Sequence, residues 1–206
     1  MENFKKDLLY WAKRLYQKNM SPATSGNISV RTSKGVLISA SNVCLNDMAE
    51  DDLILIDFDG NTLCKNAKKP SSEKFLHTQI YEMRDDINAI IHSHCPLITA
   101  FAVAHQPMRA PIMPEFVFNF DNIPLAEYET PSSIKLAAKT SKFFTSHNIV
   151  LMANHGVVCG GAELKECFYN LEALRAYAET YFAANILGKP KLLNKAQIED
   201  IRKLKG

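Results

Sequence analysis

The sequence has no long apolar run and no large excess of charge of either sign. None of its 206 residues lies in a segment approaching the ~18 consecutive apolar residues of a transmembrane helix. The start, MENFKKDLLYW, lacks the apolar core and small-residue cleavage site of a secretory signal. Lys and Arg total 24 and Asp and Glu total 22, so the net charge is +2. This small charge does not indicate binding to nucleic acid or to a membrane surface. We therefore expect a cytoplasmic protein with no nucleic-acid and no membrane partner.

Cysteine is sparse and unpatterned. The five cysteines are odd in number and none stands in a CxxC pair, which argues against a disulfide framework and for reduced thiols. The chain also lacks internal repeats, low-complexity runs and linker-like stretches. Its length lies close to the usual size of about 100–200 residues for one domain. We therefore expect a single domain over residues 1–206.

Apolar spacing predicts helices that alternate with short strands. Thr130 followed by Pro131 is typical of a helix start, and Ser71 or Ser72 is a candidate cap for the helix that begins near residue 73. Residues 106–122 match no element. The close strands between residues 27 and 63 favour antiparallel pairing, so the expected fold class is layered α/β with a helix-covered sheet. Helices are expected at 3–18, 73–84, 96–105, 131–146, 163–187 and 194–204, and strands at 27–31, 35–39, 53–57, 87–92, 123–125, 149–153 and 156–159.

Three histidines follow apolar strands. In His92-Ser93-His94 the two histidines are two residues apart on a strand, so both imidazoles point to the same face and can approach one ion. His155 also ends a strand and precedes Gly156, a residue typical of a sharp turn or a close backbone approach. Together they predict a divalent-metal site with three histidine ligands. Zinc is the first candidate, and iron, nickel, cobalt and manganese are alternatives. The plainer interpretation is a set of surface histidines at strand ends.

Two small-residue segments carry a second candidate chemistry. Pro70-Ser71-Ser72-Glu73 is typical of a helix start, where serine caps and glutamate complements the helix dipole. Hydroxyls and free amides at a helix start also form an anion site, and Glu73 beside them suits a general base or a metal ligand. Thr24-Ser25-Gly26-Asn27 is either a plain turn into a strand or a loop that binds phosphate through amides and hydroxyls.

These motifs in order resemble a known family. The set SGNIS (25–29), PSSE (70–73), HSH (92–94) and NHG (154–156) is similar to the class II aldolase/adducin family, and within it to the fuculose-phosphate aldolases. The resemblance spans roughly residues 5–185. It implies a three-layer α/β/α fold with a central, mostly antiparallel sheet. It also implies a fourfold-symmetric homotetramer with active sites at subunit interfaces.

The resemblance also assigns roles to single residues. His92, His94 and His155 look like the ligands of one Zn²⁺ per subunit. Glu73 looks like the catalytic carboxylate, which in relatives can also ligate the resting metal. His77, one helical turn after Glu73, is interpreted as an ordinary helix-face residue.

The expected binding site for the substrate's phosphate has three parts. Gly26 and Asn27 match one part, and Ser71 and Ser72 match another. The family's third part is a Thr-Gly pair, and this sequence has Ser41-Asn42 there. Serine keeps the hydroxyl, and asparagine tolerates left-handed backbone better than most residues. We therefore include Ser41 and Asn42 in the expected phosphate site.

The proton donor departs from the family pattern. The fuculose-phosphate aldolases supply a tyrosine from the neighbouring subunit, and an ungapped count puts Met113 at that position. A thioether cannot donate a proton. Glu115 is the nearest possible acid, where burial among Ile112, Met113, Phe116 and Phe118 would suit it for that role, and Tyr128 is another. The competing interpretation of Glu115 is an exposed loop charge.

The function that the resemblance implies is a zinc-dependent carbon–carbon lyase. It would cleave a small phosphorylated ketose to dihydroxyacetone phosphate and an aldehyde through a metal-stabilised enediolate. Two alternatives remain open. The same metal site serves dehydration, decarboxylation or 4-epimerisation of a sugar phosphate in relatives, and adducin-like members are non-catalytic binding modules.

Overall fold

The fold is organised around one mixed sheet. The computed structural model describes residues 1–64 and 68–204. Within these residues seven strands form a sheet in the order β3-β2-β1-β4-β7-β6-β5. Every neighbouring pair is antiparallel except β5 and β6, which are parallel. The strands are β1 (Asn27–Thr32), β2 (Gly35–Ser39), β3 (Leu53–Ile56), β4 (Ala89–Ser93), β5 (Leu125–Ala126), β6 (Ile149–Met152) and β7 (Gly156–Gly161).

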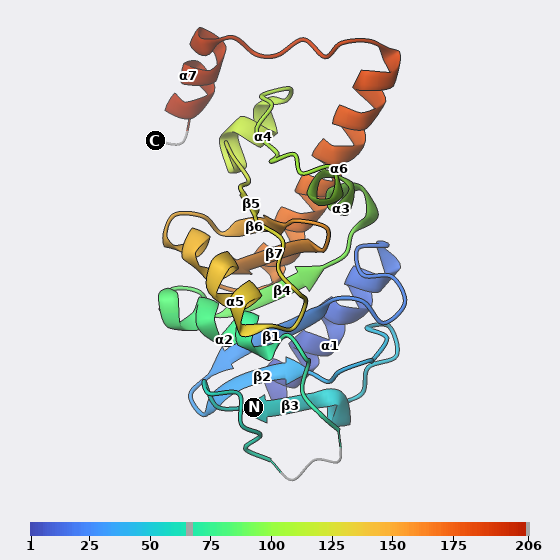
Figure 1. Ribbon diagram of the computed structural model, residues 1–206, viewed down its shortest axis with the longest axis vertical. Helices are drawn as coiled ribbons and strands as arrows, with labels where there is room; N and C mark the ends of the chain where they lie inside the picture. Colours follow the sequence, from blue (N-terminus) through green and yellow to red (C-terminus); the bar gives the residue numbers. More distant parts are fainter. Residues whose placement is uncertain (65–67, 205–206) are drawn as a thin grey trace.

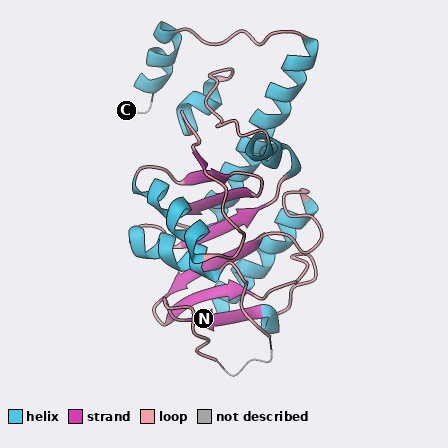
Figure 2. Ribbon diagram, in the orientation of Figure 1, coloured by secondary structure: helices cyan, strands magenta, loops and turns pink. Residues whose placement is uncertain are grey.

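Helices cover both faces of this sheet, which confirms the expected three-layer α/β/α fold with a mostly antiparallel sheet (Figures 1 and 2). Helices α1, α3 and α6 contribute to one buried apolar cluster, and α2 and α5 contribute to the other. The helices are α1 (Glu2–Gln17), α2 (Lys74–Met83), α3 (Pro96–Val103), α4 (Pro114–Asn119), α5 (Ile134–Ser141), α6 (Leu164–Leu187) and α7 (Lys195–Lys203), with short 3-10 turns at Glu50–Asp52 and Lys142–Thr145.

Strand β4 illustrates how the two layers of helices arise from the sequence. Successive side chains point to opposite faces, so Ala89 and Ile91 join the cluster with α1 and α6, whereas Ile90 joins the cluster with α2 and α5. Full burial of an isoleucine side chain contributes roughly 1.5–3 kcal/mol. His92 continues the alternation on the same face as Ile90. A polar side chain therefore enters the layer between the sheet and α2.

One predicted helix start was wrong by three residues, and one predicted helix cap was wrong. Helix α5 begins at Ile134, and its cap is Ser133, whose Oγ accepts the backbone N–H of Leu136 at 3.1 Å. A helix from Pro131 is prevented because Ser132 has a left-handed φ of 65°. Helix α2 begins after Glu73, whose side chain makes no capping bond.

The segment that matched no predicted element contains the short helix α4. Helix α6 runs well past the sheet, and an extended connection leads back to α7, which packs against α4 (Figure 1). Arg202 of α7 is paired with Asp121 at 2.7 Å. No helix in the described ranges combines the length and the apolar character needed to cross a membrane.

Candidate active site

Three histidines meet at one end of the sheet. His92 lies one residue before the end of β4, directly opposite Asn27 of β1, and His94 follows two residues later on the same face. His155 lies in the tight turn between β6 and β7. The antiparallel pairing of β4 with β7 brings this turn beside His92. One ligand atom from each of the three rings lies within 4.8 Å of the others.

Glu73 reaches this cluster from the start of α2. Its Oε2 lies 2.9 Å from His92 Nε2, and its Oε1 lies 3.4 Å from His155 Nε2. Asn27 Nδ2 donates to Oε2 at 3.4 Å, and the backbone N–H of Ser132 donates to Oε1 at 3.4 Å. Burial by itself would raise the pKa of Glu73, but His92, His155 and Asn27 together hold that pKa well below its usual range. Glu73 is therefore an ionised carboxylate.

The imidazoles are arranged to bind a cation. Burial lowers the pKa of His94 to about 3 and that of His155 to about 4, so both rings are neutral and carry a free lone pair. His92 Nδ1 lies 3.0 Å from the carbonyl oxygen of Val157, and donation there leaves Nε2 as the ligand atom. That Nε2 lies 2.9 Å from both His94 Nε2 and Glu73 Oε2. Such close electron-rich atoms need a proton or a cation between them, so this donor set fits zinc.

Two glycines allow the backbone to approach the cluster. Gly26 has a left-handed φ of 77°, and a Cβ there would lie 2.6 Å from the carbonyl oxygen of His92 and 2.7 Å from Ser21 Oγ. A Cβ on Gly156 would lie 2.6 Å from the carbonyl oxygen of Ser93 and within 3.3 Å of two imidazole rings. Any larger residue at either position would displace the strand end that carries His92.

A polar cavity of about 210 Å³ opens beside the histidines and Glu73. Asn42 has a left-handed φ of 59°, which suits the asparagine that stands in place of glycine. The loops therefore bring hydroxyl, amide and backbone groups to one hollow next to the cluster. All six residues expected to bind phosphate line this cavity: Gly26, Asn27, Ser41, Asn42, Ser71 and Ser72.

The sequence over residues 6–182 matches the family described as Class II Aldolase and Adducin N-terminal domain. The chain belongs to this family. It is 32% identical over 175 residues to an L-fuculose phosphate aldolase of Methanocaldococcus jannaschii, covering 85% of this chain and 93% of the relative. It is 29% identical over 206 residues to a 5-deoxy-D-ribulose 1-phosphate aldolase of Bacillus thuringiensis serovar kurstaki, covering 98% and 95%. A solved structure of an L-fuculose 1-phosphate aldolase superposes with a TM-score of 0.90 at 29% identity, covering 100% of this chain and 98% of that one.

This class II aldolase superfamily member has a site residue that the sequence interpretation set aside. His77 was interpreted as an ordinary helix-face residue, but its side chain is fully buried. Its Nδ1 lies 2.7 Å from Ser29 Oγ, and its Nε2 lies 2.5 Å from Asn27 Oδ1. A signal for this arrangement exists in the sequence. Glu73, His77 and Tyr81 are spaced by four residues, which places them along one face of a helix.

Ser132 is a second residue that sequence patterns missed. It lines the cavity, and its Oγ donates to Ser72 Oγ at 2.9 Å. Its left-handed backbone brings its N–H toward Glu73, and such strain in a residue other than glycine is concentrated at functional sites. No local motif marks this serine, because its position depends on the packing of α5 against α2.

Of the two interpretations of Glu115, the structure agrees with the exposed one and not with burial among Ile112, Met113, Phe116 and Phe118. Phe116 and Val117 occupy the inward face of the short helix α4, so Glu115 on the other face is exposed. It lines a hollow with Ile201 and Leu204 of the C-terminal segment, outside the cavity beside the histidines. Tyr128, the other candidate acid, is also exposed and absent from the residues lining that cavity.

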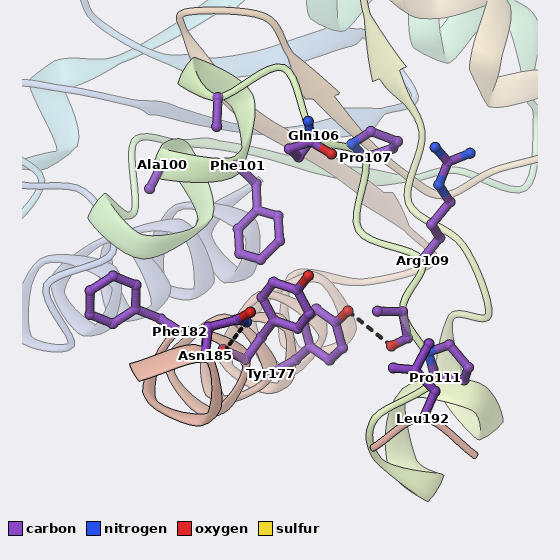
Figure 3. A pocket seen from close by; sticks show the side chains of 13 residues that line it. Ala100, Phe101, Gln106, Pro107, Arg109, Pro111, Tyr177, Phe182, Asn185 and Leu192 are labelled. Carbon is purple, nitrogen blue, oxygen red and sulfur yellow. Dashed lines mark hydrogen bonds between the residues drawn. The ribbon is translucent and has the colours of Figure 1, made fainter. Parts of the chain in front are cut away.

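A larger cavity of about 550 Å³ lies elsewhere, between α3, α6 and residues 106–111 (Figure 3). Aromatic rings dominate it, with Phe101 and Phe182 facing the gap and Tyr177 donating its hydroxyl to the carbonyl oxygen of Ala110 at 2.9 Å. None of the histidines or Glu73 lines it. The groups able to bind a metal and move a proton are those of the smaller polar cavity.

Proposed function

We propose that this protein is a zinc-dependent aldolase that cleaves a small phosphorylated ketose to dihydroxyacetone phosphate and an aldehyde. The observation that carries the proposal is the convergence of three imidazole side chains with the buried Glu73 carboxylate at the edge of a polar cavity. The names of the two aldolase relatives support a sugar phosphate as the substrate class.

His92, His94 and His155 would hold the zinc. When bound, the metal supplies Lewis-acid stabilisation of negative charge on the substrate's oxygens. Val157 supports this role for His92, because its carbonyl oxygen accepts a hydrogen bond from Nδ1–H and so orients the ring.

Glu73 would transfer the proton at carbon. In the condensation direction its carboxylate removes a proton from the hydroxymethyl carbon of dihydroxyacetone phosphate, and the resulting enediolate attacks the aldehyde carbonyl. An acid then protonates the new alkoxide, and cleavage runs through the same steps in reverse. The ionised Glu73 carboxylate is in the protonation state that can accept this proton.

Phosphate binding would anchor the substrate away from the reacting carbons. The backbone around Gly26, the Asn27 amide and the hydroxyls of Ser41, Ser71 and Ser72 line the cavity that would receive it. Asn42 would present backbone from its left-handed turn. Holding a remote dianion in this way contributes binding energy that positions the carbonyl against the metal.

The acid would come from a neighbouring copy of the chain. Among the described residues that line the cavity, Glu73 is the only carboxyl group and there is no tyrosine. We therefore propose a homotetramer with active sites at subunit interfaces, in which an exposed Glu115 faces the site of the adjacent copy. The variant Glu115→Gln should slow turnover strongly and leave zinc content and phosphate inhibition intact. Unchanged kinetics would return the acid role to Tyr128 or to water.

We also propose one cytoplasmic domain over residues 1–206. All five cysteines are free thiols, which supports a reducing compartment. Both apolar clusters share the same sheet, which supports a single folding unit.

A substrate screen with product identification tests the proposed function. The purified zinc protein is offered ketose 1-phosphates, their unphosphorylated sugars and phosphorylated sugar acids. We expect dihydroxyacetone phosphate and an aldehyde from a ketose 1-phosphate, with competitive inhibition by inorganic phosphate. Loss of water, release of carbon dioxide or an epimeric product would replace cleavage with the corresponding alternative. Absence of both turnover and bound metal would favour a binding module.

A further inference from the structure

Five polar side chains form a continuous line beneath the polar cavity. Tyr81 Oη lies 2.8 Å from Ser29 Oγ, and Ser29 Oγ lies 2.7 Å from His77 Nδ1. His77 Nε2 lies 2.5 Å from Asn27 Oδ1, and Asn27 Nδ2 lies 3.4 Å from Glu73 Oε2. Tyr81, Ser29 and His77 are fully buried, and Asn27 and Glu73 are 6% and 7% exposed.

The direction of every hydrogen bond in this line follows from the carboxylate at its end. Glu73 only accepts, so the amide group that faces it must be the Asn27 NH₂, and the Asn27 carbonyl oxygen must face His77. That oxygen only accepts, so His77 must carry its proton on Nε2. Burial lowers the pKa of His77 to about 3, so the ring is neutral. Its Nδ1 therefore accepts from the Ser29 hydroxyl, which leaves Ser29 Oγ to accept from Tyr81.

We propose that His77 is a positioning residue that holds the Asn27 amide with its NH₂ toward Glu73 and the cavity. The inference rests on the proposed function, because it names how that site presents its anion-binding donor. An NH₂ group has two N–H bonds. One faces Glu73, and among the described residues nothing else accepts from Nδ2, so the second is available to a bound phosphate.

A flipped amide would do the opposite. The Asn27 carbonyl oxygen would then face the Glu73 carboxylate and repel an incoming phosphate. The amide would also present its NH₂ to His77, which would have to move its proton to Nδ1 and give up the hydroxyl donated by Ser29. The Glu73 carboxylate and the buried chain from Tyr81 to His77 are therefore both satisfied in only one of the two amide orientations, which asparagine alone does not distinguish.

Two substitutions at position 77 separate positioning from simple packing. His77→Phe keeps a ring of similar size but removes both nitrogens. His77→Gln restores an N–H donor that can reach Asn27 Oδ1. Ile80→Ala is the matched control, because Ile80 is also fully buried on α2 and belongs to the apolar cluster instead of the polar line. All are measured as zinc-loaded full-length protein, with Tm and zinc content recorded.

We expect His77→Phe to raise the inhibition constant of inorganic phosphate and to lower kcat/KM by about 10–100-fold, the usual effect of removing a group that orients a ligand. Zinc content should stay at the wild-type level. His77→Gln should regain most of the loss, and Ile80→Ala should lower Tm while leaving phosphate inhibition unchanged. Equal effects of His77→Phe and Ile80→Ala, no rescue by glutamine, or loss of zinc in His77→Phe would each overturn the proposal.

The tautomer of His77 gives a readout that does not depend on activity. Long-range ¹H–¹⁵N correlation spectra of ¹⁵N-histidine-labelled protein, with His77 assigned by its loss in His77→Phe, should give a neutral ring with the proton on Nε2. A proton on Nδ1 would overturn the proposal. If the wild-type protein cleaves no ketose phosphate and binds no phosphate, the proposed function fails. The spectrum then still decides whether His77 holds the Asn27 amide in the proposed orientation.

Discussion

Of the aromatic and the polar cavity, the larger one is lined mainly by apolar and aromatic residues, whereas the smaller one holds the histidines and Glu73. The aromatic cavity between α3 and α6 measures about 550 Å³, and the cavity beside the histidines measures about 210 Å³. Tyr177 and Tyr181 stack their rings 6.0 Å apart in the first, whereas His92 and Glu73 are brought within 2.9 Å in the second.

Buried polar groups indicate the position of an active site better than cavity size does. Bringing a carboxylate and three imidazoles out of water costs free energy unless they are paired or bind an ion. A protein keeps such a cluster where it is used, and strongly perturbed titration marks candidate sites for that reason. The smaller cavity has the buried cluster of charged and ionisable groups. The pKa values of His94, His155 and Glu73 are also all shifted from their ordinary values.

Among the changes that test this comparison of the two cavities, removing a histidine of the cluster should have the largest effect. His92→Ala should lose bound metal and lower turnover by more than about 10³-fold, because Lewis-acid stabilisation supplies several kcal/mol. Elemental analysis and circular dichroism of the purified variant measure metal and fold. The control is His147→Ala, a histidine that lines another hollow away from the cluster. Stoichiometric zinc in both His92→Ala and His155→Ala would rule out the proposed ligand set.

Replacing the carboxylate should have the next largest effect. Glu73→Gln keeps the shape and removes the base, so we expect kcat to fall by roughly 10²–10⁴-fold. If Glu73 served only to complement the helix dipole, the change would cost about 0.3–1 kcal/mol of stability and little activity. Glu166→Gln is the matched control, since Glu166 lies in the first turn of α6. Near-normal turnover in Glu73→Gln would contradict its role as the base.

The tight loop at Gly26 should give a smaller effect that combines strain with weaker phosphate binding. Gly26→Ala forces a Cβ to within 2.6 Å of the His92 carbonyl oxygen at a positive φ. We expect about 1–3 kcal/mol lower stability and weaker inhibition by phosphate. Gly60→Ala has a similar φ of 80°, but its neighbours are the flexible Lys74 chain and the Phe75 ring edge. Denaturant unfolding and phosphate inhibition separate the two, and equal phosphate inhibition in both variants would detach the Gly26 loop from phosphate binding.

The smallest effect is expected in the larger cavity. The Tyr181 hydroxyl makes no hydrogen bond with the part of the chain that the structure describes, so Tyr181→Phe should change stability by less than about 0.5 kcal/mol. Steady-state kinetics on the identified substrate should match the wild type. A large fall in kcat with metal retained would move the chemistry toward the aromatic cavity and reverse the comparison.

Local patterns in the sequence predicted most of the elements and failed at their ends. Short β-like runs at 27–31 and 87–92 predicted strands β1 and β4, and the apolar spacing in α1 and α6 predicted helices, because both signals depend on near neighbours. The start of α5 was wrong because the left-handed Ser132 blocks the helix that Thr130 and Pro131 favour. The same serine contacts Glu73, so the failure coincides with the candidate site.

The candidate site divides in the same way. The types of donor, the shared face of His92 and His94, and the small residues around Gly26 can all be read along the chain, because they depend on residue chemistry and strand alternation. The approach of His155 to His92 depends on β4 pairing with β7 in one register. The approach of Glu73 to the histidines depends on α2 packing over β1. The burial of His77 and the exposure of Glu115 likewise depend on packing between segments distant in the sequence. Neighbouring residues encode none of these contacts, because each exists only when the whole sheet and its two layers of helices assemble.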